Sequence, residues 1–133
     1  MNSRRIWTLA SLIAIVPVGF ASKLLAPRDS WLRDHGAGAL YEVFWILAAF
    51  FVWPSERAVK RIAIWVFSVT CVLEFLQLWH PPFLQRIRAT FIGATLIGTT
   101  FDWWDFPPYA LGSLLGWAWV VLLIRGTVRK PSR

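Results

Sequence analysis

The sequence predicts an all-α fold, a polytopic integral membrane helical bundle with four transmembrane helices and one short re-entrant or interfacial helix. Hydrophobic residues make up 57% of the chain, charged residues only 16%, and ten of the 133 residues are Trp. Soluble domains contain roughly a quarter charged residues, so this is a membrane composition. No linker, repeat or low-complexity tract divides the chain, and we expect residues 1–133 to form a single membrane domain.

Four apolar segments account for the spans, at about residues 6–21, 38–53, 62–79 and 109–124. Their lengths of sixteen to eighteen residues lie at the short end of the spanning range. Trp7, Trp53 and Trp79 stand at segment ends, where interfacial aromatic belts form. The first segment also resembles a cleaved signal peptide, but we favour a retained signal anchor.

The distribution of basic residues predicts the orientation of the bundle. Four spans place both termini on one side, and the basic residues then divide nine to five, which favours cytoplasmic N- and C-termini. The larger group is Arg4, Arg5, Arg57, Lys60, Arg61, Arg125, Arg129, Lys130 and Arg133, and the smaller group is Lys23, Arg28, Arg33, Arg86 and Arg88. Because topology explains the net charge of +7, we expect no nucleic-acid partner.

The apolar stretch 89–101 is the weak point of this topology, because a fifth span there, in a chain with its N-terminus outside, would also satisfy the charge count. The stretch has about thirteen residues, too few for an ordinary span. We therefore expect a re-entrant or interfacial helix at about residues 83–101.

Polar residues at membrane depth gather on the extracytoplasmic side in this topology. Thr70, Glu74 and Gln77 are spaced i, i+4 and i+7, which places them on one helical face. That face should look into the bundle, because a charge exposed to lipid costs several kcal/mol. The full predicted cluster is Tyr41, Glu42, Glu74, Gln77, Arg86, Arg88, Asp105 and Tyr109.

The carboxylate of Glu74 is expected to pair with an arginine from the following segment, Arg88 first and Arg86 second, because a guanidinium holds a carboxylate with two hydrogen bonds. Such a pair would either take part in ligand binding or only clip the short helix onto the bundle.

Asp105 precedes the predicted start of the last span near Pro107, and the missing N–H groups of Pro107 and Pro108 leave its carboxylate free for a cation or a polar head group. Asp102 and Asp105 also have metal-site spacing, but no third ligand is obvious and we expect neither a metal nor a cofactor. The lone Cys71 excludes an internal disulfide. No known catalytic motif is present, so the catalytic residues stay unknown, and Glu74 would be the base if chemistry occurs.

Small residues indicate close helix packing. Gly112 and Gly116 form a GxxxG motif, and Gly93 and Gly98 each follow an alanine at the same spacing. We favour packing within the chain over a dimer interface.

The ordered motifs resemble a family of small bacterial membrane proteins, domain of unknown function 2809. The resemblance runs from about Gly38 to Trp117 and rests on LEFLQLW at 73–79, PPFL at 81–84, IRAT at 87–90, LIGTTF at 96–101, WDF at 104–106 and YALG at 109–112. The chain has Gly38 and Ala39 where the family often carries an acidic residue, with Glu42 following instead. A fainter resemblance, to VanZ-like proteins of the cell envelope, rests on Glu74, Gln77, Arg88, Asp105 and Gly112.

These resemblances imply a multi-pass protein of the bacterial cytoplasmic (inner) membrane or another internal energy-transducing membrane, without supplying a reaction. Our first hypothesis is that the polar cluster binds the head group of a membrane lipid, an envelope precursor or a membrane protein partner, including a second copy. Arg86 and Arg88 would then meet anionic groups. A membrane enzyme with Glu74 as base and a structural or assembly factor are the alternatives.

Overall fold

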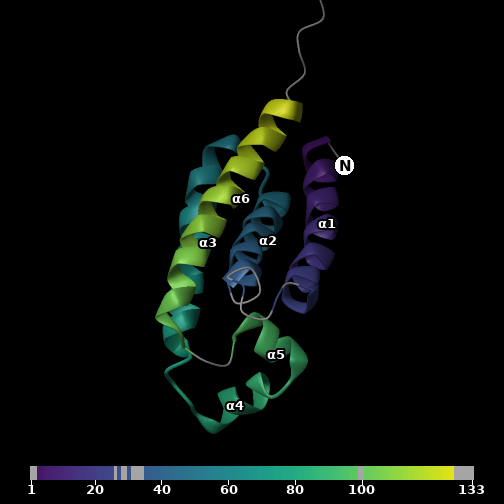
Figure 1. Cartoon of the computed structure of the whole chain (residues 1–133). Coiled ribbons are helices and arrows are strands. Elements are labelled where there is room, and N and C mark those ends of the chain that lie inside the picture. The colour runs from purple at the N-terminus through teal and green to yellow at the C-terminus, as the bar shows by residue number, and fades with distance from the viewer. Residues whose placement is uncertain (1–2, 26, 28–29, 31–34, 99–100, 128–133) are drawn as a thin grey trace, which may run out of the picture.

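The computed structural model describes residues 3–25, 27, 30, 35–98 and 101–127, and within these ranges the protein is entirely helical. Four long helices run side by side: α1 (Ser3–Leu25), α2 (Ala37–Val52), α3 (Val59–Leu76) and α6 (Phe106–Thr127) (Figure 1). They coincide with the four predicted apolar segments, each starting one to three residues earlier. Several residues of the predicted charge division lie outside the described ranges: Arg28, Arg33, Arg129, Lys130 and Arg133.

Two stretches are long and apolar enough to cross a membrane, Ser3–Leu25 and Trp103–Thr127. α2 is a shorter apolar helix of sixteen residues. The start of α1 and the end of α6 lie at the same end of the bundle (Figure 1).

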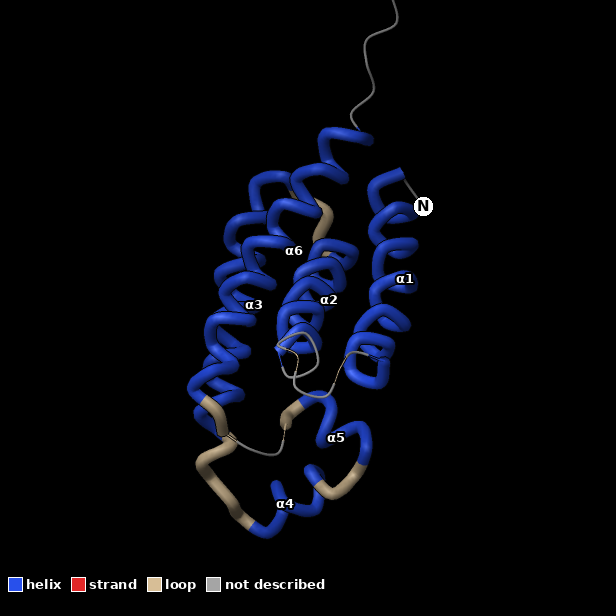
Figure 2. The backbone as a smooth tube through the Cα atoms, viewed as in Figure 1, coloured by secondary structure: helices blue, strands red, loops and turns tan. Residues whose placement is uncertain are grey.

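The opposite end is closed by two short helices, α4 (Pro82–Arg88) and α5 (Phe91–Leu96), with the turn between them, which we call the cap (Figure 2). The single helix predicted at 83–101 is therefore wrong in its continuity. Thr90 breaks it, because its hydroxyl accepts a hydrogen bond from the N–H of Gly93 at 3.0 Å and so starts a new helix as an N-cap. At 1.5 Å of rise per residue, the six residues of α5 cannot cross a bilayer, which also overturns the fifth-span alternative.

Three of the glycines lie against other parts of the chain. A Cβ on Gly112 would lie 2.3 Å from the carbonyl oxygen of Ala39, and one on Gly116 would lie 2.8 Å from the Cδ1 of Ile46, so α6 meets α2 at backbone contact distance. A Cβ on Gly93 would lie 1.8 Å from the carbonyl oxygen of Ile87, so this glycine allows the corner between α4 and α5.

The apolar core lies in the half of the bundle away from the cap. Ile46, Leu47 and Phe50 of α2 are fully buried there, together with Val120 of α6. Most of the buried polar side chains lie in the other half, next to the cap.

Candidate functional site

A cavity of about 950 Å³ lies between the long helices and the cap. α1 contributes a largely apolar wall, and α2, α3 and the 102–109 segment contribute most of the polar lining. Its lining includes Phe20, Tyr41, Thr70, Glu74, Asp105 and Tyr109.

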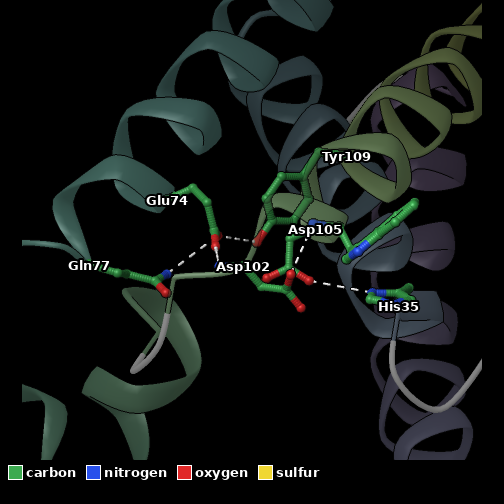
Figure 3. Close-up of polar contacts among 7 residues, drawn as sticks. His35, Glu74, Gln77, Asp102, Asp105 and Tyr109 are labelled. Carbon is green, nitrogen blue, oxygen red and sulfur yellow. Dashed lines mark hydrogen bonds and ion pairs between the residues drawn. The ribbon is translucent and has the colours of Figure 1, made fainter.

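Glu74 is the hub of the polar lining, and only 1% of its surface is exposed. One carboxylate oxygen accepts a hydrogen bond from the backbone N–H of Asp102 at 2.9 Å. The other oxygen accepts from the hydroxyl of Tyr109 at 3.0 Å and from the amide of Gln77 at 3.5 Å (Figure 3). The last turn of α3 is thereby tied to the segment that leads into α6.

Aromatic packing brings that segment to Glu74. The ring of Phe75, next to Glu74 on α3, lies 5.8 Å from the rings of Phe101 and Trp103 and 5.5 Å from that of Phe106. The carboxylate of Asp102 accepts from the N–H of Trp104 at 3.0 Å and starts a short 3₁₀ turn, Trp103–Asp105. The N–H of Asp102 is left to point at Glu74.

Asp105 lies beside Glu74 and interacts with its carboxyl group. An oxygen of Asp105 is also 3.4 Å from Nδ1 of His35, which approaches from the segment before α2 (Figure 3). The side chains of Asp105 and His35 are 27% and 19% exposed, so this pair is the more accessible part of the cluster. The Asp105 carboxylate therefore contacts His35 and the Glu74 carboxyl group.

The predicted pairing of Glu74 with an arginine is wrong. Arg88 is 5% exposed and donates instead to the carbonyl oxygens of Leu76 at 2.9 Å and Trp79 at 2.8 Å. These carbonyls, at the end of α3 and in the turn after it, lack partners within the helix and attract a cation. Within the described ranges no ion pair joins Arg88 to Glu74, whose hydrogen-bond donors are uncharged groups.

Arg86, the second predicted partner, is exposed on α4 and does not line the cavity. The two arginines are therefore not part of an anion-binding cluster.

Gln77, which also contacts Glu74, and Tyr41 hold the end of α5. The amide of Gln77 donates to the carbonyl oxygen of Ile97 at 2.9 Å, and the hydroxyl of Tyr41 donates to that of Leu96 at 2.7 Å. Gly98 follows with a φ of +87°, and a Cβ there would lie 2.3 Å from the amide nitrogen of Gln77. Only glycine therefore lets the chain turn this close to Gln77.

Glu42 forms a second, deeper polar site at the crossing of α2, α3 and α6. Its side chain is 0% exposed and accepts a hydrogen bond from the hydroxyl of Ser113 at 2.9 Å. Glu42 and Glu74 are predicted from the sequence to belong to one cluster. No described hydrogen bond joins their carboxyl groups, and Glu42 does not line the cavity.

Sequence reasoning missed Ser113 and the contact of His35 with Asp105. Ser113 lies four residues after Tyr109, on the same face of the helix, and this spacing is a signal that could have found it. No local pattern marks His35, because its contact joins segments seventy residues apart. Among the described residues, no group of three His, Cys, Asp or Glu side chains is placed to hold a metal ion.

Comparison with known families gives one finding, a match to the family described as "Protein of unknown function (DUF2809)" over residues 27–113, more than half of the chain. The matched region contains α2, α3, the cap, most of the polar cluster and the start of α6. No solved structure matches the chain.

Proposed function

This chain belongs to the family described as Protein of unknown function (DUF2809), and we propose that it is a four-span membrane protein whose cavity binds a lipid-like molecule with a head group rich in hydrogen-bond donors, either hydroxyls or amines. The carrying observation is the cavity itself, which joins an apolar wall to a cluster of carboxyl groups.

The outer faces of the long helices support a membrane location. Large apolar side chains are exposed on helices around the bundle, for example Ile13 (66%), Trp65 (70%) and Leu114 (65%). Water-soluble proteins rarely leave such continuous apolar surfaces uncovered, whereas lipid tails cover them at no cost. With two helices that pass the length and composition test, four spans are the arrangement that these surfaces favour.

Charge supports cytoplasmic termini in this proposal. Arg4 and Arg5 of α1, Arg57 and Lys60 before and within the first turn of α3, and Arg125 near the end of α6 belong to the end of the bundle opposite the cap. Arg4 forms an ion pair there with Glu56. Basic residues at the membrane edge favour the cytoplasmic side, so the cap and the cavity would face the other side.

The chemistry of the cavity indicates the ligand. Phe20 and Ile15 of α1 provide surface for an acyl or isoprenoid chain, while Glu74 and Asp105 provide hydrogen-bond acceptors with negative charge. No described arginine lines the cavity, and the described basic residues in its lining are Lys23 and His35. Hydroxyl or ammonium groups therefore fit this lining better than phosphate.

Binding is better supported than catalysis. The chain carries no known catalytic motif. The carboxylate of Glu74 is held in place by the N–H of Asp102 and the hydroxyl of Tyr109, and its remaining lone pairs can accept hydrogen bonds from a head group. The internal-glue alternative explains these bonds but does not explain a cavity of this size beside them.

Blocking the cavity tests the proposal. Gly19 lines the cavity and a Cβ there meets nothing within 4 Å, so Gly19→Leu places a side chain in the space without a clash. Gly126 is equally open but lies at the other end of α6 and does not line the cavity, so Gly126→Leu is the matched control. Native mass spectrometry of the detergent-extracted protein should show bound lipid in the wild type and in Gly126→Leu, and at least tenfold less in Gly19→Leu.

The head-group contact is tested separately with Asp105→Asn, which removes charge while preserving shape. Bound lipid should fall, or change to a different class, while the exposed Glu56→Gln control matches the wild type. A folded wild-type protein that carries no lipid after extraction and takes up none from a panel of amine- and hydroxyl-headed lipids would leave only the structural role.

A further inference from the structure

Glu42 occupies an environment that the proposed lipid binding does not explain. The carboxyl group lies between α2, α3 and α6 with 0% exposure. One of its oxygens, Oε2, accepts from Ser113, whereas Oε1 is buried and accepts no hydrogen bond. A bare carboxylate oxygen so placed costs several kcal/mol.

No cation compensates the charge of a Glu42 carboxylate among the described residues. The titratable groups that interact with it are Tyr41 on its own helix and Cys71 on α3, and the nearest titratable residue along α6 from its partner Ser113 is Tyr109, one turn earlier. None of these carries positive charge. From α1, Lys23 reaches the cavity lining but forms no ion pair with Glu42.

The hydroxyl groups around Glu42 can each donate only one proton. The hydroxyl of Thr70 donates its proton to the carbonyl oxygen of Val66 at 2.8 Å. Towards the neighbouring Glu42, the Thr70 oxygen therefore acts as an acceptor. The hydroxyl of Ser113 lies 2.9 Å from Glu42 and also 2.9 Å from the carbonyl oxygen of Tyr109, and can donate to only one of them at a time. An acceptor thus faces the carboxyl group, which is one hydrogen short.

We propose that Glu42 is a proton-binding site, with its carboxyl group holding a proton in a hydrogen bond to the Thr70 oxygen. The proton exchanges with the cavity when the Thr70 hydroxyl turns from the carbonyl oxygen of Val66, passes its own proton to water in the cavity and takes the proton of Glu42 in its place. Thr70 is 4% exposed and lines the cavity, so a single hydroxyl separates the acid from that space. On the other side α6 closes the site, because a Cβ on Gly112 would lie 2.7 Å from the Cβ of Glu42. The proton of Glu42 therefore exchanges on the cavity side. This site goes beyond the proposed lipid binding and does not depend on it.

Infrared spectroscopy of the purified protein tests the charge state of Glu42. A carbonyl stretch from a neutral, weakly hydrated carboxyl group is expected in the wild type and should be lost in Glu42→Gln. The exposed Glu56→Gln control should keep it. If Glu42→Gln does not fold, Ser113→Ala serves instead, because loss of one hydrogen bond should shift the frequency of the band.

The route is tested by the rate at which the band shifts after transfer to heavy water. Thr70→Val keeps the shape of the side chain but removes the hydroxyl, and should slow the shift at least tenfold, while Thr70→Ser should match the wild type. A neutral-carboxyl absorption that is the same with and without Glu42 would overturn the proton site. An absorption that appears only when sodium is removed would also overturn it, because Glu42 would then bind a sodium ion instead of a proton. Equal exchange rates in Thr70→Val and the wild type would overturn the route.

Discussion

At the scale of single residues, the charged and polar side chains near the cap mostly satisfy backbone groups. Arg88 binds two carbonyl oxygens, Gln77 and Tyr41 bind one each in the cap, and Glu74 accepts from the N–H of Asp102. Short helices and turns expose such groups, and each one left unpaired in a dry environment costs several kcal/mol. The short helices of the cap are therefore stabilised by these side chains.

Arg88→Met should destabilise the protein by about 2–4 kcal/mol, because two charge-assisted hydrogen bonds are lost. The carbonyl of Trp79 loses the donor that Arg88 supplies, while the carbonyl of Leu76 keeps the N–H of Trp79. Unfolding in detergent micelles, followed by circular dichroism, measures the change. Arg86→Met, on the exposed side of α4, is the control and should stay within about 0.5 kcal/mol of the wild type.

The same measurement distinguishes the observed contacts from an ion pair. If Arg88 neutralised Glu74, adding Glu74→Gln to Arg88→Met would restore stability. The observed contacts predict that the double variant is no more stable than Arg88→Met alone.

At the scale of the elements, α6 holds the bundle together by contacting both α2 and α3. Gly112 and Gly116 bring α6 against α2, and Ser113 between them reaches Glu42. The two glycines differ in what they face. Gly112 meets the backbone of Ala39, which cannot move without displacing a helix, whereas the nearest atom to Gly116 is the end of the Ile46 side chain.

Gly112→Ala should therefore cost about 3 kcal/mol and Gly116→Ala about 1 kcal/mol, since overpacking against backbone forces the helices apart while a side chain rearranges. Gly126→Ala, which meets no neighbour, should cost nothing. Thermal unfolding of the three variants in the same detergent checks the order. Equal losses for Gly112→Ala and Gly126→Ala would contradict the close approach of α6 to α2.

At the scale of the whole molecule, the protein has two chemically different ends. The end with the chain termini carries the exposed basic residues Arg57, Lys60 and Arg61, and the other end carries the cap, exposed aromatic side chains such as Trp104, and the acidic cavity. In the topology that we propose, the basic end would lie on the cytoplasmic side and the acidic, aromatic end on the opposite side.

Cysteine labelling of intact cells tests that orientation. In a Cys71→Ser background, an impermeant thiol reagent should label Gln85→Cys on the cap and should label Arg57→Cys only after the cells are broken open. Both positions are exposed, so accessibility within the protein does not limit either reaction. Labelling of Arg57→Cys in intact cells would reverse the proposed topology.

Several features of the protein were evident from its sequence. Apolar segments of helical length, divided by short basic tracts, predicted all four long helices, because hydrophobic patterning is a local property of the chain. The i, i+4, i+7 spacing predicted that Thr70, Glu74 and Gln77 face the interior of the bundle, and all three side chains are buried. The ordered motifs also identified the family correctly.

The partners of those inward-facing groups were decided only by the tertiary structure. A sequence shows the signs of charges but not the backbone groups that a fold leaves unpaired. Their opposite charges suggested that Arg88 would pair with Glu74. Instead, Arg88 donates to the carbonyl oxygen of Leu76 at the end of α3, and the Glu74 carboxylate accepts from the N–H of Asp102. The separation of Glu42 from Glu74 arose in the same way, from a hydrogen bond to Ser113 that exists only once α2 and α6 are packed. The break at Thr90 is different, because it comes from a local N-cap hydrogen bond to the N–H of Gly93.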